Sequence, residues 1–333
     1  MSSFDLPGAT VTGIGSLPYR HSAEAAKLAL EAFELPAVPT LPNRSPAEGM
    51  IAQALVGLQG ITVGQYGSIA IDVQRIDPFA DVRTDLQHDA FGGFRAFIEV
   101  AAGRQAPVKW QFVGPVTLGL ALMRAGVPAS AAFEVAVRAV RSHVQHLLDI
   151  FAATLPGCRQ VVFIDEPSLG ELMLPGFPIA PDTAIDLVSG ALAVIEPVGL
   201  AGLHVCAHAD IASLLATGPA VLSVPAVPSL VESAGYLTRF LEEGGVVAWG
   251  AVSTSGPIAT SVERPWRQLS ALWCELVTAG ADPALLRTNS MITPECGLGM
   301  HTPGVAARIC RITAELGRRV RDQAVAARFA LGA

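Results

Sequence analysis

Short apolar segments alternate with longer segments of helical periodicity along most of the chain. The apolar segments have the length and composition of buried strands. The longer segments place apolar residues three and four positions apart, which is typical of amphipathic helices. The predicted strands cover 9–15, 61–72, 108–113, 160–165, 200–206, 220–224, 245–252 and 285–289, and the clearest helices cover 22–33, 131–155, 265–280 and 304–329.

Eight strands that alternate with helices predict a parallel sheet, and eight such units favour closure into a (β/α)8 TIM barrel. The alternative is an open, doubly wound sheet, which would carry a G-x-G-x-x-G motif after an early strand. The sequence TGIGSLP at 12–18 instead has two glycines followed by a proline. No linker or break in composition divides the chain, so we expect one barrel domain over residues 1–333. The proline-rich segment 34–46 is expected to form a loop over the barrel mouth.

The composition fits a barrel with a large core. The chain has 333 residues, of which 51% are hydrophobic and 15% are charged. The most apolar region is interrupted by Glu196 and Pro197 before it reaches the roughly 18 residues that span a bilayer. The N-terminal residues lack the basic and apolar regions of a signal peptide. We therefore expect a cytoplasmic protein with no membrane partner.

The net charge bears on nucleic-acid binding, and the cysteine content bears on disulfides and metal ligands. The formal net charge is −7, whereas a nucleic-acid-binding protein needs a basic face. We therefore expect no nucleic-acid partner. The five cysteines are odd in number and widely spaced, so they predict free thiols or metal ligands and not a disulfide framework.

Polar residues that can take part in catalysis or ligand binding lie at the predicted C-terminal ends of strands, where barrels of this kind carry their active sites. Asp165 and Glu166 follow the apolar run 161–164 directly, and Pro167 enforces a turn after them. A buried carboxylate needs a compensating partner, so one of these two is a candidate for holding a substrate ammonium group. An internal salt bridge or a helix cap explains the pair equally well.

His204 and Cys206 lie two positions apart on a predicted strand. Alternation along the strand places both side chains on one face, about 7 Å apart along the backbone, which suits two ligands of one zinc ion. Cys296, in a turn-forming segment after the eighth predicted strand, is a candidate third ligand. The alternative is that Cys206 is a small buried hydrophobe and His204 a hydrogen-bonded core histidine.

Five motifs together resemble a known family. GIGSLP, GPVTL, IDEPSLGE, HVC and PECGLG occur in the order found in the C-terminal, catalytic barrel of cobalamin-independent methionine synthase. The resemblance covers nearly the whole chain, which is similar to a single-barrel member of that family. It implies a zinc-dependent S-methyltransferase that acts on homocysteine or a related small-molecule thiol.

The resemblance also assigns individual residues. It implies that Asp165 holds the amino group of the substrate, and Asp165 and Glu166 are the candidate catalytic residues. Glu171 matches a glutamate near the folate. The remaining positions bind the metal or contact homocysteine: His204, Cys206 and Cys296 match zinc ligands, and Ile14, Gly15 and Ser16 match the homocysteine-contacting segment.

The sequence departs from the family at the fourth zinc ligand. The family has a glutamate on the next strand, but the segment 220–230 contains no carboxylate. Three possibilities remain open: a site with two cysteines, one histidine and an open position; a fourth donor from His208 or Glu295; or loss of the metal. The first is the one that we expect.

Other departures affect the residues that serve the methyl donor in the family. A histidine that donates a proton in the family is replaced by Ser253 or Thr254. A tryptophan that stacks on the pterin is missing, and Ala121 lies near its place. We therefore expect the methyl donor to be either a corrinoid, free or carried by a partner protein, or methyl-tetrahydrofolate.

Two other functions compete with this one. A metal-free barrel of the uroporphyrinogen decarboxylase or corrinoid methyltransferase type would use Arg44, Arg75 and Arg83 to hold carboxylates. A non-catalytic binding protein would have kept the pocket after losing the complete zinc site.

Overall fold

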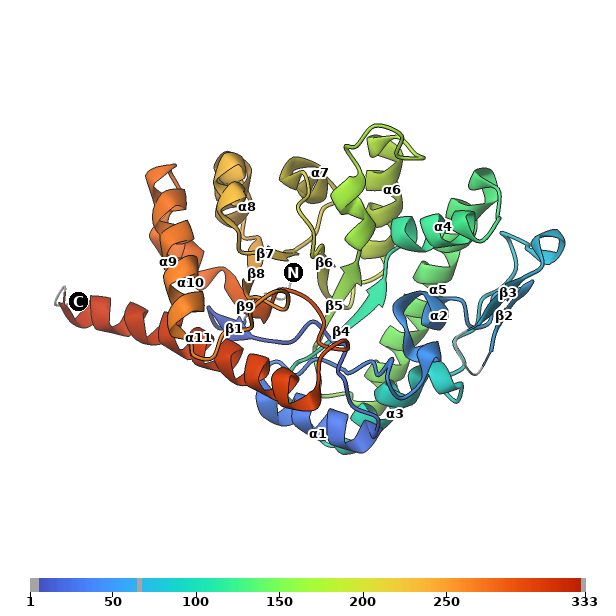
Figure 1. Ribbon diagram of the computed structural model, residues 1–333, viewed down its shortest axis with the longest axis horizontal. Coiled ribbons are helices and arrows are strands. Elements are labelled where there is room, and N and C mark those ends of the chain that lie inside the picture. Colours follow the sequence, from blue (N-terminus) through green and yellow to red (C-terminus); the bar gives the residue numbers. More distant parts are fainter. Residues whose placement is uncertain (1–5, 65–67, 331–333) are drawn as a thin grey trace.

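Seven parallel strands form a curled sheet that is surrounded by helices (Figure 1). The computed structural model describes residues 6–64 and 68–330, with side chains as far as residue 323. Neighbouring strands follow the order β1-β9-β8-β7-β6-β5-β4. The strands are β1 (Thr10–Val11), β4 (Val108–Val113), β5 (Gln160–Asp165), β6 (Gly199–His204), β7 (Val221–Pro225), β8 (Val246–Val252) and β9 (Ser290–Pro294).

The extended segment 35–40 lies between β1 and β4 and joins the two edges of the sheet. Leu35 bridges in parallel to Thr12, and Ala37 bridges to Lys109. The backbone N–H of Val38 donates to the carbonyl of Lys109 at 2.8 Å. The wall of the barrel therefore contains eight extended segments, which confirms the predicted TIM-barrel class.

The second strand of the barrel lies where we expected a loop. Pro36 and Pro39 each remove a backbone donor, so segment 35–40 forms isolated bridges and not a continuous ladder. The strand expected at 61–72 is instead an antiparallel hairpin, β2 (Ile61–Val63) and β3 (Ile69–Ile71), outside the barrel sheet. Residues 65–67 of that prediction lie outside the described residues.

The prediction of a last strand at 285–289 was also wrong in position. Residues 285–288 belong to the helix α10 (Pro283–Thr288), and the strand β9 follows it. The side chain of Asp282 accepts a hydrogen bond from the backbone N–H of Ala284 at 2.6 Å, and Pro283 occupies the first helical position. Both are strong signals for the start of a helix, and they override the apolar pattern.

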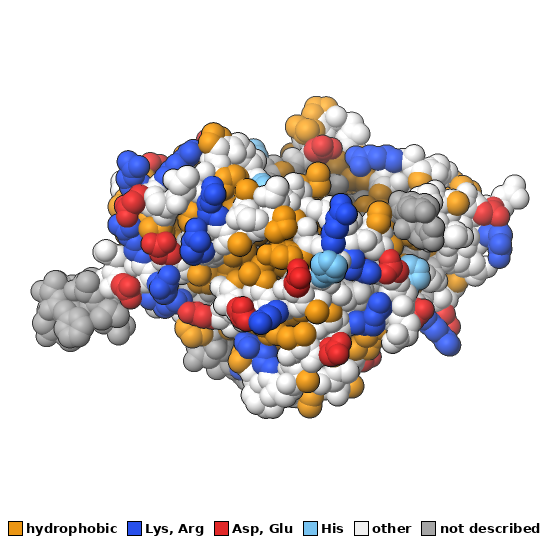
Figure 2. Space-filling view, turned by 60° about the horizontal axis from the view of Figure 1, so that its bottom comes forward, with side chains coloured by type: hydrophobic (Ala, Val, Ile, Leu, Met, Phe, Trp, Pro, Cys, Tyr) orange, Lys and Arg blue, Asp and Glu red, His pale blue; other side chains and the backbone are white. Residues whose placement is uncertain are grey.

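Helices cover the outside of the barrel, and the four clearest predicted helices are confirmed within two residues. None of the helices in the described ranges combines the length and apolarity needed to cross a membrane. On the face shown in Figure 2, positive and negative side chains are interspersed around hydrophobic areas. The other helices are α1 (Ser22–Ala32), α2 (Met50–Ala54), α3 (Gly92–Val100), α4 (Pro115–Arg124), α5 (Ala129–Thr154), α6 (Pro181–Leu192), α7 (Ile211–Ala216), α8 (Ala234–Glu242), α9 (Glu263–Thr278) and α11 (Pro303–Ala330).

The barrel interior has an apolar layer and, toward the C-terminal ends of the strands, a polar layer. Because side chains alternate along a strand, the positions two residues beyond the apolar layer face the interior again. Phe163 is followed in this way by Asp165, and Val221 by Ser223. The apolar layer consists of Leu35, Val161, Phe163, Val221, Ala248 and Met291.

Trp110 fixes β4 to the surrounding helices. Its ring stacks on Phe151 of α5 with 5.8 Å between centroids and an interplanar angle of 8°. Its indole N–H donates to Gln160 Oε1 at 2.9 Å, and the side chain is fully buried. The contact therefore joins β4 to α5.

Replacing Trp110 with alanine should lower the free energy of unfolding by about 3–5 kcal/mol, because a large cavity forms and the Gln160 amide loses a partner. Trp110→Phe should cost less. Urea unfolding followed by circular dichroism measures both, with Trp266→Ala, a partly buried tryptophan on α9, as the control. An effect of Trp110→Ala no larger than that of the control would contradict this account.

Candidate functional site

A cavity of about 320 Å³ opens at the C-terminal ends of the strands. Met300, which is 95% exposed, and Met50, which is 41% exposed, belong to its lining. Six of the predicted site residues line it: Ile14, Ser16, Asp165, His204, Cys206 and Cys296. The cavity thus brings together residues from the β1 end, the β5 end, the β6 end and the segment after β9.

His204, Cys206 and Cys296 form one cluster. One ligand atom of each lies within 4.8 Å of the others. Within the described part of the chain, no other group of three or more His, Cys, Asp or Glu side chains comes together in this way. His204 is the last residue of β6, so the strand delivers it to the cavity, and Cys206 follows two positions later.

The two nitrogens of His204 have different surroundings. Nδ1 lies 2.9 Å from Ser223 Oγ. Nε2 is buried and has no hydrogen-bond partner. A buried polar atom without a partner is costly, so an unpaired nitrogen beside two sulfur atoms is a sign that a ligand belongs there. Imidazole nitrogen and thiolate sulfur are the donors that zinc prefers, and the residues present therefore fit a zinc ion.

The two cysteine thiols are electrostatically coupled. The hydrogen bond with Cys206, and then the neighbouring His204, lowers the pKa of Cys296 well below its ordinary value. The same contact with Cys296, followed by burial, raises the pKa of Cys206. The contact therefore shifts the pKa values of the two thiols in opposite directions and favours the thiolate at Cys296.

Asp165 is the buried carboxylate of the cavity. It is 6% exposed, and its Oδ1 has no hydrogen-bond partner. Burial raises the pKa of Asp165 to about 6, while the charges of His204 and Lys109 act in the opposite direction. A buried carboxylate with an unpaired oxygen is suited to bind a cationic group such as an ammonium.

Lys109 and Gln111 are site residues that the sequence analysis missed. Lys109 is fully buried, and its Nζ donates to the Ile14 carbonyl and, at 3.0 Å, to Gln111 Oε1. Burial lowers the pKa of Lys109 to about 8, against the opposing effect of Asp165. The signal was a lysine inside the otherwise buried strand VKWQFV, since a buried ammonium needs polar partners.

Gly15 lets the segment after β1 approach Gln111. Its φ of +149° is a conformation that residues with a side chain rarely adopt. A Cβ at this position would lie 1.9 Å from the Gln111 amide nitrogen. Only glycine therefore allows Ile14 and Ser16 to line the cavity from this side.

Glu166 does not line this cavity. It is fully buried and accepts hydrogen bonds from the backbone N–H groups of Val116 at 2.7 Å and Thr117 at 2.8 Å, and from Thr117 Oγ1 at 2.6 Å. These donors belong to the first turn of α4. The contacts are those of a helix cap, one of the alternatives that the sequence left open.

Glu171 lies apart from the cluster. It is exposed and lines a separate cavity of about 370 Å³ together with Arg124 and Phe177. The structure therefore does not bring Glu171 together with Asp165 and the cysteines.

The candidate fourth donors point elsewhere. His208 is exposed, and its Nδ1 lies 3.4 Å from Ser229 Oγ. Glu295 accepts hydrogen bonds from Ser253 Oγ at 2.8 Å and from the Thr254 backbone at 3.3 Å. Neither belongs to the cluster, which therefore has three ligand residues among those described.

The arginines of the competing function do not line the cavity. Arg44 forms ion pairs with Glu48 at 2.5 Å and with Asp89 at 2.8 Å. Arg75 and Arg83 are exposed, and neither contributes to the cavity lining. The geometry therefore gives no support to a site that holds substrate carboxylates with these arginines.

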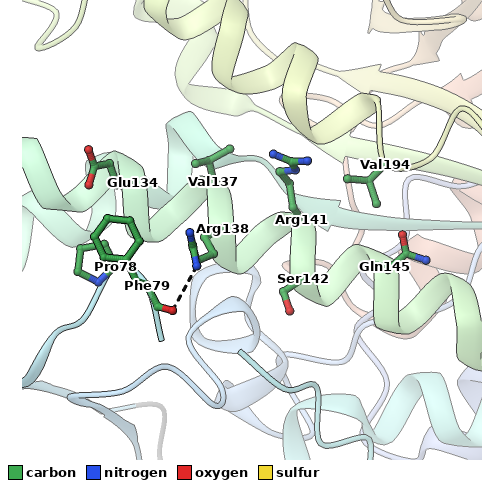
Figure 3. A pocket seen from close by; sticks show the side chains of 9 residues that line it. All are labelled: Pro78, Phe79, Glu134, Val137, Arg138, Arg141, Ser142, Gln145 and Val194. Carbon is green, nitrogen blue, oxygen red and sulfur yellow. Dashed lines mark hydrogen bonds between the residues drawn. The ribbon is translucent and has the colours of Figure 1, made fainter. Parts of the chain in front are cut away.

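A larger cavity of about 560 Å³ lies outside the barrel, between residues 78–79 and α5 (Figure 3). Arg138 donates to the Phe79 carbonyl at 3.2 Å and lies over the Phe79 ring. None of the predicted site residues lines it. Size alone therefore does not mark the functional site.

Comparison with solved structures identifies the architecture. The chain superposes on a B12-independent methionine synthase from Shewanella sp. W3-18-1 in complex with selenomethionine, with a TM-score of 0.65, 13% identity, and coverage of 96% of this chain and 99% of that one. The fold is that of methionine synthase barrels. A putative vitamin-B12-independent methionine synthase from Listeria monocytogenes matches with a TM-score of 0.59 and 14% identity over 90% of this chain and 85% of that one. No model of a protein family and no curated protein matches the chain.

Glu166→Ala should lower the free energy of unfolding by about 3 kcal/mol, because it leaves backbone donors of α4 buried without an acceptor. Glu166→Gln should have a smaller effect, since its amide oxygen replaces part of the acceptor capacity. Chemical denaturation measures both variants. If Glu166→Ala were as stable as the wild type, the carboxylate would not be acting as a cap.

Proposed function

We propose that this protein is a zinc-dependent S-methyltransferase that transfers a methyl group to the thiol of homocysteine or a related amino-acid thiol. The observation that carries the proposal is the convergence of His204, Cys206 and Cys296 in one cavity with Asp165. The likeness to methionine synthase barrels supports it at the level of the fold. One cavity of the barrel therefore contains both the residues that would bind zinc and a carboxylate that would bind an amino group.

His204 Nε2 and the sulfur atoms of Cys206 and Cys296 would hold the zinc ion. Zinc, when bound, favours the thiolate form of a substrate thiol at neutral pH. Three protein ligands leave one coordination position for the substrate, as catalytic zinc sites require. Zinc binds cysteine as the thiolate, so binding the cation would release the protons that the two cysteines carry.

Asp165 would bind the substrate ammonium and so orient the amino acid with its sulfur toward the cluster. Ile14 and Ser16 bound the same cavity from the β1 side, where Lys109 fixes the Ile14 carbonyl. In the reaction the thiol releases its proton to solvent, and a sulfur–carbon bond forms as the bond between methyl and donor breaks, with the electron pair left on the donor. The donor in this proposal is a methyl-corrinoid, free or on a partner protein, or methyl-tetrahydrofolate.

Metal content tests the ligand set. The purified chain should contain about one zinc per molecule, and Cys206→Ser or Cys296→Ser should lower that content because serine is a poor zinc ligand. Cys274→Ser, which changes an exposed cysteine of α9, is the matched control and should retain the metal. Elemental analysis gives the readout, and equal zinc in all three variants would remove these cysteines from the site.

Activity tests the reaction. The zinc-loaded protein should form methionine from homocysteine with methylcobalamin or with methyl-tetrahydrofolate, measured by mass spectrometry. Formation with one donor and not the other identifies the donor. No methionine with either donor would overturn the enzymatic proposal and leave a barrel that only binds its ligand.

Asp165→Asn should weaken homocysteine binding about tenfold or more, because the ammonium loses an ionic hydrogen bond. The des-amino analogue of homocysteine should bind the wild type and the variant equally. Isothermal titration calorimetry measures the four affinities. If the wild type bound homocysteine and its des-amino analogue equally well, Asp165 would not recognise an amino group.

A further inference from the structure

Three neighbouring strands place two polar side chains beside His204. β6 lies between β5 and β7, and His204 pairs in register with Asp165 on one side and with Ser223 on the other. Side chains at paired positions of neighbouring strands lie on the same face of the sheet. The imidazole therefore has a carboxylate neighbour and a hydroxyl neighbour within the polar layer of the barrel.

We propose that Ser223 is the residue that orients His204 for metal binding, and that it thereby leaves Asp165 free for the substrate. The inference deepens the proposed function and rests on it. It adds a positioning residue, since Ser223 contacts the metal ligand and does not line the cavity itself.

The contact with Ser223 fits the tautomer of His204 that binds a metal through Nε2. A neutral imidazole carries one N–H, and a metal binds the nitrogen that lacks it. Nδ1 lies 2.9 Å from Ser223 Oγ, so the hydroxyl oxygen can accept a hydrogen bond from Nδ1–H in the tautomer that leaves Nε2 for a metal. The lone pair of Nε2 then remains in the cluster with the two sulfur atoms, where it has no partner within the protein.

The group that accepts the N–H of His204 determines whether Asp165 is free to bind a ligand. Metal-bound histidines commonly donate their second N–H to a carboxylate or a carbonyl. The register partner of His204 is a carboxylate, Asp165, yet its Oδ1 has no hydrogen-bond partner. Because the hydroxyl accepts the imidazole N–H, the carboxylate keeps its acceptor capacity for a ligand.

β7 supplies the residue that orients His204, but it supplies no metal ligand. Pro225 lies two positions after Ser223 and so shares its face of the strand. Proline has no side-chain donor atom for a metal. The strand therefore supports His204 through Ser223, while the cluster keeps three ligand residues.

The first test measures metal affinity and not turnover. Zinc affinity of the metal-depleted chain is obtained by competition with a chromogenic chelator, and the Co²⁺-loaded protein reports the ligand geometry through its absorption spectrum. Ser223→Ala should weaken zinc binding about 10- to 100-fold and change the Co²⁺ spectrum. Ser290→Ala, another buried serine of a barrel strand, is the matched control and should leave both unchanged.

A near-isosteric pair separates hydrogen bonding from packing. Ser223→Thr keeps the hydroxyl and Ser223→Val lacks it, while the two side chains have nearly the same shape. The threonine variant should bind zinc at least tenfold more tightly than the valine variant, an effect of the size expected for an outer-shell hydrogen bond. Equal affinities for the pair would overturn the proposal even if the alanine variant failed to fold.

Asp165→Asn tests the alternative that the carboxylate orients His204. It should weaken zinc binding less than Ser223→Ala does and leave the Co²⁺ spectrum unchanged, because Asp165 attracts the cation only through its charge and does not orient His204. A loss of zinc affinity in Asp165→Asn as large as in Ser223→Ala would show that the carboxylate is the orienting partner. Failure of the wild-type chain to bind zinc would overturn the proposed function itself, whereas unchanged affinity in Ser223→Ala would overturn only this inference.

Discussion

The register between β5, β6 and β7 is the constraint on which the site depends. Parallel pairing places Asp165, His204 and Ser223 side by side at the C-terminal ends of three neighbouring strands. A shift of one residue would turn each of these side chains out of the barrel. The apolar layer beneath them, which includes Phe163 and Val221, secures that register because the same shift would move these side chains out of the barrel interior.

Burial gives these polar groups their properties. Lys109 and Asp165 lie within the barrel, where desolvation moves the pKa of each toward neutrality. Lys109 finds partners in a carbonyl and an amide, whereas Asp165 and His204 each retain one atom without a partner. Unsatisfied polar atoms at the end of a barrel are typical of a site that is completed by a ligand.

The sequence predicted the parts of the fold in which local signals agree. β4 and β5 lie where the apolar runs predicted them, and the amphipathic periodicity located α5 and α11. The prediction failed where closure of the barrel decides the structure. The segment 35–40 reads as a proline-rich loop, and its pairing with β1 and β4 arises only because both edges of the sheet come together there.

By itself the sequence determined which chemical groups are available: two cysteines and a histidine at the ends of segments, an acidic pair after a buried run, and glycine at position 15. Only the tertiary structure decided their roles. Asp165 and Glu166 are adjacent in the chain, yet one lines the cavity and the other caps α4, because successive residues point in opposite directions as the strand ends. The roles of Lys109 and Ser223 depend on contacts across the barrel, which local sequence patterns do not encode.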